Sequence, residues 1–282
     1  MDRRLLTGVL LVALSGCGMT GIANGGQVDT GQTNTGETNT GRLSTGRVDG
    51  AVGDGPRAGT EDVEPGVLKG RVTDARGRPV EGAEVVADNQ VLHDSNAVVR
   101  TGADGTYRVR TNIGVTFHAT ATVTRRYDGQ EYTMSLAPDD DAPFAGPSGA
   151  IRNFTWRLSG ERPDGLGFYG GKVLFHLDAT DPLDPDAFLD DEKVRLSLTP
   201  DGPLVDGSPG AAIARRAGRN GDGSGLEDVP IGRYRITADY EGRPLLVKLR
   251  GGGDYADEVV AGFAPVMTGV YHIQLELALP RA

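Results

Sequence analysis

The chain has 282 residues, which is enough for two domains of ordinary size. Its 29 basic and 39 acidic residues give a net charge of −10. This charge disfavours nonspecific binding of nucleic acid, because the phosphate backbone needs a basic surface. The single cysteine excludes an intramolecular disulfide, a cysteine-based zinc site and a CxxC redox pair.

The first residues have the pattern of an export signal. Arg3 and Arg4 provide a positive start, and residues 5–14 form an apolar run. This run is too short for a membrane-spanning helix, which needs about 20 residues. We therefore expect residues 1–16 to be a signal peptide that is removed on export.

Residues 14–17, Leu-Ser-Gly-Cys, resemble the lipobox of bacterial lipoproteins. The resemblance implies cleavage before Cys17 and a lipid on its sulfur, and two or three acyl chains hold a protein firmly at a membrane. Gly18 is similar to the residue that directs lipoproteins to the outer membrane, in cells that have two membranes. The alternative is that Cys17 ends an ordinary signal peptide and is lost or left as a thiol.

Residues 17–65 form a segment without any aromatic residue, in which a Thr-Gly pair recurs every five residues from Thr30 to Thr45. Such a segment cannot bury enough apolar surface to offset its chain entropy. We expect a disordered Thr/Gly-rich linker with a reach of about 40 Å.

Residues 66–159 alternate between apolar and polar positions, with turn residues at short intervals. Expected strands are 67–73, 80–87, 107–109, 117–123, 132–136 and 154–158. This pattern is typical of an antiparallel β-sandwich, and we expect Phe154 and Trp156, which share one face, to lie in its core.

Two motifs follow each other in this first module. The first is G-x-V-x-D-x-x-G-x-P-V-x-G-A-x-V, whose residues are Gly70, Val72, Asp74, Gly77, Pro79, Val80, Gly82, Ala83 and Val85. The second is T-x-x-D-G-x-Y-x-V, whose residues are Thr101, Asp104, Gly105, Tyr107 and Val109. Together they resemble the carboxypeptidase regulatory-like domain. The resemblance implies a seven-stranded prealbumin-like sandwich whose motif residues are structural and not catalytic.

Residues 165–282 are expected to form a second, related β-sandwich. Alternation recurs at 173–177, 194–198, 245–249 and 270–277, and the turn at Gly232 and Tyr234 is similar to the prealbumin-like superfamily. Asp184 and Pro185 predict one helical turn through residue 189, and residues 256–260 predict another. The expected fold class is therefore all-β, with two tandem antiparallel β-sandwiches after a signal peptide and a linker.

The sequence holds no nucleophilic-serine motif, zinc-protease motif, phosphate-binding loop or dinucleotide fingerprint. The four histidines are isolated in sequence: His93, His118, His176 and His272. We therefore expect no catalytic residue and no enzymatic activity.

A polar loop offers a candidate cation site. Asn220, Asp222 and Ser224 occupy positions one, three and five of an EF-hand-like loop with glycine at position six, which suits Ca²⁺. Position twelve is Ile231, where a bidentate glutamate belongs. Two interpretations stay open: a calcium site, or the polar turn that precedes a strand.

Ligand binding by aromatic rings is a second candidate property. Sugar rings stack on exposed aromatic side chains, and Phe168, Tyr169 and Tyr255 are the candidates. Packing at the boundary between the two modules explains Phe168 and Tyr169 equally well.

We expect a membrane-anchored, non-enzymatic lipoprotein of the cell envelope that binds or scaffolds envelope polysaccharide or protein. One alternative is a carbohydrate-binding surface lipoprotein that captures polysaccharide. Another is a glycan-active enzyme, which needs a pocket with two carboxylates within about 10 Å.

Overall fold

The structure is a computed structural model that describes residues 62–93 and 95–281. The predicted signal peptide, Cys17 and nearly all of the predicted linker lie outside these residues. Within the described residues the chain forms strands and three short 3₁₀ helices, so the expected all-β class is confirmed. None of these helices has the length and apolar character needed to cross a membrane.

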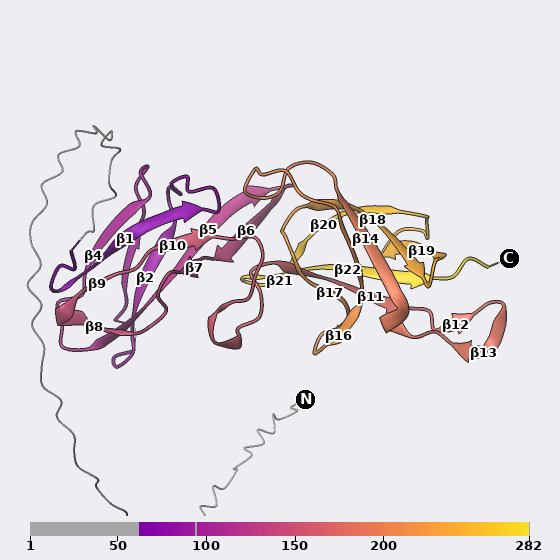
Figure 1. Cartoon of the computed structure of the whole chain (residues 1–282), viewed down its shortest axis with the longest axis horizontal. Helices are drawn as coiled ribbons and strands as arrows, with labels where there is room; N and C mark the ends of the chain where they lie inside the picture. The colour runs from indigo at the N-terminus through magenta and orange to yellow at the C-terminus, as the bar shows by residue number, and fades with distance from the viewer. Residues whose placement is uncertain (1–61, 94, 282) are drawn as a thin grey trace, which may run out of the picture. The chain divides into compact units, whose positions relative to one another are not determined.

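The first module consists of two five-stranded sheets, drawn in indigo to magenta in Figure 1. One sheet contains β1 (Val67–Asp74), β4 (Thr106–Arg110), β7 (Ala137–Pro138), β9 (Ala150–Ile151) and β10 (Phe154–Trp156). The other contains β2 (Glu84–Asn89), β3 (Ala97–Arg100), β5 (Thr116–Tyr127), β6 (Gln130–Ser135) and β8 (Phe144–Ala145). The strand orders are β4-β1-β10-β7, with β9 beside β1, and β3-β2-β5-β6, with β8 beside β5.

The alternation along the sequence places the predicted apolar residues in the core of this module. In β5 the buried positions are Phe117, Ala119, Ala121 and Val123, and the positions between them are half-buried or exposed. Phe154 and Trp156 of β10 are buried in the same apolar cluster, as predicted. Because strand side chains alternate between faces, this period of two fixes which side of each sheet is covered.

The motif residues hold turns by hydrogen bonds. The Asp74 carboxylate accepts the backbone N–H groups of Arg76 and Arg78, each at 2.9 Å, which closes the turn after β1. The hydroxyl of Thr101 donates to the Val80 carbonyl at 2.7 Å and accepts from the Ala83 amide at 2.9 Å. These polar groups are buried, and their hydrogen bonds offset the cost of removing them from water.

The pairing within the first module is not purely antiparallel, and this corrects the predicted antiparallel sandwich. β1 pairs in parallel with β10, where Val72 lies opposite Phe154, and in parallel with β9. Parallel partners must be joined by a long crossover, so the short turns that dominate the sequence do not reveal them.

The second module is built on one ten-stranded sheet, drawn in rose to yellow in Figure 1, and not on the two sheets of a sandwich. Its order is β15-β14-β18-β19-β22-β11-β17-β16, with β20 beside β18 and β21 beside β22. The strands are β11 (Gly171–Leu177), β14 (Val194–Pro200), β15 (Ile213–Arg216), β16 (Gly218–Asn220), β17 (Gly223–Val229), β18 (Arg233–Tyr240), β19 (Arg243–Leu249), β20 (Val259–Gly262), β21 (Ala264–Met267) and β22 (Val270–Ala278).

This sheet curls until its two ends meet. The Arg215 side chain of β15 donates to the Glu227 carbonyl of β17 at 2.8 Å, although the two strands lie near opposite ends of the strand order. The sheet is therefore nearly closed on itself. Its centre is a parallel pair, in which Lys172 of β11 lies opposite His272 of β22.

The two helical turns predicted for this module are absent from the described residues, and these predictions were wrong. Asp184–Phe188 forms β13, which pairs with β12 (Thr180–Asp181) in a hairpin. Residues 259 and 260 begin β20, which pairs with β18. The helices that the described chain does contain are η1 (Gly146–Ser148), η2 (Pro163–Gly165) and η3 (Asp191–Lys193).

Tyrosines join the first module to the second, and both modules belong to one compact unit. The buried Tyr132 hydroxyl of β6 donates to the Phe263 carbonyl at 2.6 Å. The Tyr271 hydroxyl of β22 donates to the Thr133 carbonyl at 3.0 Å and accepts from the Thr133 amide at 2.6 Å. Burial raises the pKa of Tyr132 to about 12, so this hydroxyl stays a neutral donor at neutral pH.

Candidate functional site

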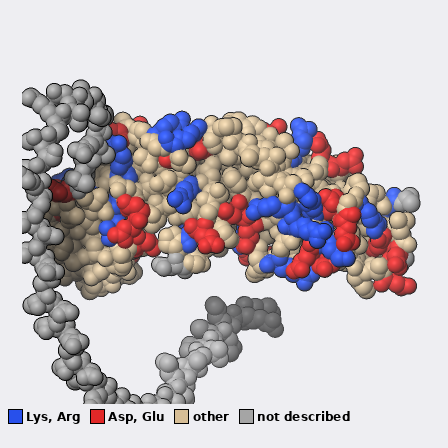
Figure 2. Space-filling model, in the orientation of Figure 1, with Lys and Arg blue, Asp and Glu red and all other residues tan. Residues whose placement is uncertain are grey.

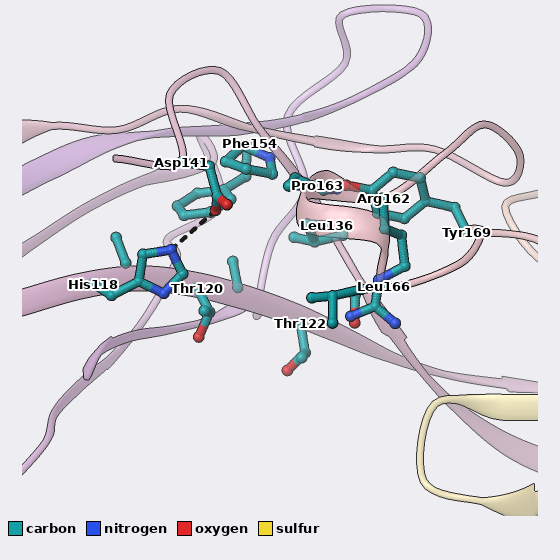
Figure 3. A pocket seen from close by; sticks show the side chains of 14 residues that line it. His118, Thr120, Thr122, Leu136, Asp141, Phe154, Arg162, Pro163, Leu166 and Tyr169 are labelled. Atoms are coloured by element: carbon teal, nitrogen blue, oxygen red, sulfur yellow. Dashed lines mark hydrogen bonds and ion pairs between the residues drawn. The ribbon is translucent and has the colours of Figure 1, made fainter. Parts of the chain in front are cut away.

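A pocket of about 320 Å³ lies between β5 and the segment that connects the two modules (Figure 3). We call it the connector pocket. Its lining comes from β5, from the chain after β6, and from residues 162–169 on both sides of η2. Connecting segments that meet a sheet in this way often carry binding residues, because the sheet fixes their position.

One wall of the connector pocket carries an ordered polar pair. The His118 Nε2 atom of β5 lies 3.0 Å from Oδ1 of Asp141, as the dashed line in Figure 3 shows. Both side chains are only partly buried. Each can therefore exchange hydrogen bonds with a ligand as well as with the other.

The connecting segment supplies the other groups. Arg162, just before η2, and Tyr169, after it, are half-buried and line the pocket with the exposed Leu166. Burial raises the pKa of the Tyr169 hydroxyl, which keeps it neutral at ordinary pH. Within the described residues, no carboxylate oxygen lies within 4.0 Å of the Arg162 guanidinium.

This set of groups suits recognition of a small molecule. Leu136 and Leu166 offer apolar surface, Tyr169 offers an aromatic ring, and polar groups surround them. A mostly apolar pocket with a few placed polar groups is the usual form of a small-molecule site. Asp141 is the one carboxylate among its described lining residues, whereas glycoside hydrolysis needs two.

The predicted ligand residues Phe168 and Tyr169 are both half-buried, and they serve different pockets. Tyr169 lines the connector pocket, whereas Phe168 lines a second pocket beside β15 and β17. Phe168 also bridges to Glu161 through the backbone. The structure therefore separates two neighbouring residues that the sequence presents as a pair.

The third predicted ligand residue, Tyr255, lies elsewhere. It is 40% exposed, and the ammonium group of Lys248 lies 4.8 Å from the centre of its ring. That cation covers one face of the ring at a distance typical of a cation–π contact. Tyr255 is thus not brought together with Phe168 or Tyr169 in either pocket that these two line.

The candidate calcium loop is held by contacts of its own. Asn220 Oδ1 accepts the Asp222 amide at 2.8 Å, and Asp222 Oδ2 accepts from the Lys172 ammonium at 2.7 Å. The buried Ser224 hydroxyl donates to Asp191 at 2.7 Å. Among the described residues, no cluster of three or more His, Cys, Asp or Glu side chains is placed to hold a metal. The calcium site stays a prediction.

Sequence reasoning missed the pairing of His118 with Asp141. His118 stands alone in the sequence, and Asp141 belongs to an acidic run whose members look equivalent. The pairing depends on how the chain after β6 returns across β5, and no spacing rule encodes that path. The burial of His272 was also not predicted. Burial lowers the pKa of this side chain, and none of the described residues forms a hydrogen bond with its Nε2 atom.

Three solved structures are similar to the chain at low identity. The TIE protein of Bacillus anthracis matches at 10% identity and a TM-score of 0.30, over 76% of this chain and 34% of that one. A C-terminal fragment of the pilus adhesin SpaC of Lactobacillus rhamnosus GG matches at 8% identity and a TM-score of 0.25, over 77% of this chain and 98% of that one. The major pilin of Streptococcus pyogenes matches at 11% identity and a TM-score of 0.20, over 78% of this chain and 99% of that one. At these TM-scores the similarities carry no argument about function.

No curated protein matches the chain. One family model does: residues 67–143 match the carboxypeptidase regulatory-like domain. The match includes both sequence motifs and ends within the acidic loop before β8. The described chain therefore contains a carboxypeptidase regulatory-like domain at residues 67–143, followed by a further β-rich region.

Proposed function

We propose that this protein is a non-enzymatic binding or scaffolding module of the cell envelope. The observation that carries the proposal is the connector pocket, which combines apolar, aromatic and polar groups at the place where two joined β modules meet. The tyrosine contacts between β6 and β22 support it, because they fix the modules that frame the pocket.

Attachment to a membrane is the second part of the proposal. The Leu-Ser-Gly-Cys sequence supports a lipid on Cys17, and the Thr/Gly repeats support a spacer between the lipid and the described modules. In a cell with two membranes, Gly18 favours the outer one. Fractionation of cells producing Cys17→Ala tests this part, since the variant is expected to leave the membrane fraction. Retention of the variant in membranes would contradict a lipid anchor.

Capture of envelope material by the purified full chain tests the binding function. The baits are isolated envelope polysaccharide, peptidoglycan and solubilised membrane proteins, and the expected result is saturable capture of one of them. The variant Leu166→Ala with Tyr169→Ala removes one apolar and one aromatic side chain from the connector pocket and is expected to weaken capture. Tyr255→Ala is the matched control, because it removes an aromatic ring outside the pocket. Wild-type protein that captures no bait would contradict the proposal.

Capture of carbohydrate is a second candidate function, and Tyr169 favours it. Its half-buried ring faces a pocket that also holds His118, Asp141 and Arg162, and such groups bind the hydroxyls of a sugar while the ring stacks on it. Saturable binding of purified polysaccharide that Tyr169→Ala abolishes would support this candidate over a protein partner.

A further inference from the structure

A second pocket, of about 280 Å³, concentrates basic side chains. It is lined by Arg215 of β15, Arg216 of β15, Arg219 of β16 and Phe168 of the connecting segment, and by the facing part of β17. We call it the arginine pocket. Such a concentration is unexpected in a chain with a net charge of −10.

Carboxylates of the chain neutralise little of the positive charge on the guanidinium groups of this pocket. Arg215 donates to the neutral backbone carbonyl of Glu227 at 2.8 Å, which leaves its charge unopposed. Arg219 lies 3.5 Å from an Asp190 oxygen, but both side chains are largely exposed, and such pairs contribute little. Within residues 62–93 and 95–281, no carboxylate oxygen lies within 4.0 Å of Arg216.

The two acidic residues that line the arginine pocket are engaged elsewhere. Glu227 pairs with the Lys172 ammonium at 3.0 Å. The Asp228 carboxylate accepts the backbone amides of Gly160, at 2.8 and 2.9 Å, and of Gly170, at 3.2 Å. Asp228 has a φ of +56°, in the left-handed region, so its position depends on these contacts. Among the described residues, neither acid forms an ion pair with the arginines of the pocket.

The strand register adds a further basic residue beside the pocket. Arg195 of β14 lies directly opposite Arg216 of β15, and both are exposed. Like charges directly opposite on neighbouring strands destabilise a sheet. Figure 2 shows basic side chains gathered over the part of the molecule that Figure 1 labels β14. A repulsion of this kind is relieved when an external anion binds between the charges.

We propose that the arginine pocket binds the oxyanion of an acidic sugar. The guanidinium fork matches a carboxylate or a phosphate with two parallel hydrogen bonds, and the ring of Phe168 provides an apolar surface for the sugar. The pocket is concave, which suits a discrete anionic group better than the flat surface of an anionic membrane. This inference rests on the proposed envelope function and names the ligand class.

Calorimetric titration of the purified full chain tests the proposal. The two acidic probes are an oligogalacturonate for the carboxylate and mannose 6-phosphate for the phosphate. The comparison probes are inorganic phosphate, a neutral malto-oligosaccharide and anionic phospholipid vesicles. We expect saturable binding of at least one acidic probe, weakening as salt is added, and no binding of the neutral one. Arg216→Gln with Arg219→Gln is expected to weaken binding about tenfold or more. Phe168→Ala is expected to weaken binding of the sugars but not of inorganic phosphate.

Arg110→Gln with Arg126→Gln is the matched control, since it removes the same charge from exposed positions of the first module. Circular dichroism checks that every variant keeps its β-structure. Unchanged affinity in the pocket variant, or an equal loss in the control, would overturn the proposal. Binding of anionic phospholipid vesicles without binding of either acidic probe would also overturn it. These titrations contain no envelope material, so their failure is distinguishable from a failure to capture envelope baits.

Discussion

The α-carbon of Gly70 lies so close to the backbone of Arg152 that a Cβ atom at Gly70 would stand 1.8 Å from the Arg152 carbonyl oxygen. The same oxygen accepts the Tyr107 hydroxyl at 2.6 Å. The first glycine of the motif thus makes room for a carbonyl that the tyrosine of the second motif binds. This contact gives the joint occurrence of the two motifs a physical cause.

Gly70→Ala is therefore expected to destabilise the first module by about 1–3 kcal/mol or more, because strand β1 must move away from Arg152. Gly114→Ala is the control, since a Cβ at Gly114 meets nothing within 4 Å. Urea unfolding measures both variants. Equal midpoints for Gly70→Ala and the wild type would contradict the close approach.

Tyr132→Phe is expected to lower the free energy of unfolding by about 1–3 kcal/mol, because it leaves the Phe263 carbonyl without the tyrosine donor in a buried place. Tyr255→Phe is the control, since Tyr255 is 40% exposed. Thermal unfolding followed by circular dichroism compares the two. An unchanged melting temperature for Tyr132→Phe would show that this hydrogen bond contributes nothing to stability.

Acid is expected to weaken the second module through Asp181. The hydrogen bonds from Arg243, at 2.5 and 3.0 Å, lower the pKa of Asp181 from 3.8 to about 2. The folded-state pKa lies below the unfolded value, so this contribution is complete above the unfolded pKa and is lost as pH falls through the folded one. Between about pH 5 and about pH 2, Asp181→Asn should therefore lose less stability than the wild type. Asp186→Asn should follow the wild type, and identical curves for all three proteins would refute the role of Asp181.

Calcium must compete with Lys172 if it binds to Asp222. The ammonium group of Lys172 occupies the Asp222 oxygen at 2.7 Å, so we expect millimolar calcium to leave the melting temperature of the wild type unchanged. Lys172→Met removes the competitor and is the variant in which binding would appear. A rise in the wild-type melting temperature that Asp222→Asn abolishes would restore the calcium interpretation of the loop.

The period of apolar residues accounts for much of the predicted fold. This period predicts the positions of β5, β6 and β14, because apolar residues recur at every second position of a strand with one buried face, whatever its partners are. It placed Phe154 and Trp156 in the core for the same reason. Pairing between distant strands leaves no such period, so the parallel pairs and the curled single sheet could not be predicted.

Local sequence signals gave wrong predictions at positions where tertiary contacts determine the secondary structure. Asp184 and Pro185 are good residues for the start of a helix, but the chain there pairs with β12, whose Asp181 is held by Arg243. The candidate sites show the same limit. The arginines of β15 and β16 are close to one another in sequence, yet the pocket exists only because the sheet curls and brings β15 beside β17.

Because β11 pairs in parallel with β22, the sheet of the second module cannot be completed before β22 is available. β22 lies between β19 and β11, and its pairing of His272 with Lys172 spans about 100 residues of chain. A chain that emerges N-terminus first exposes β11 and β19 before their shared partner β22 exists. Such long-range pairing gives the module a high contact order, and the edges of β11 and β19 need protection from aggregation until β22 pairs with them.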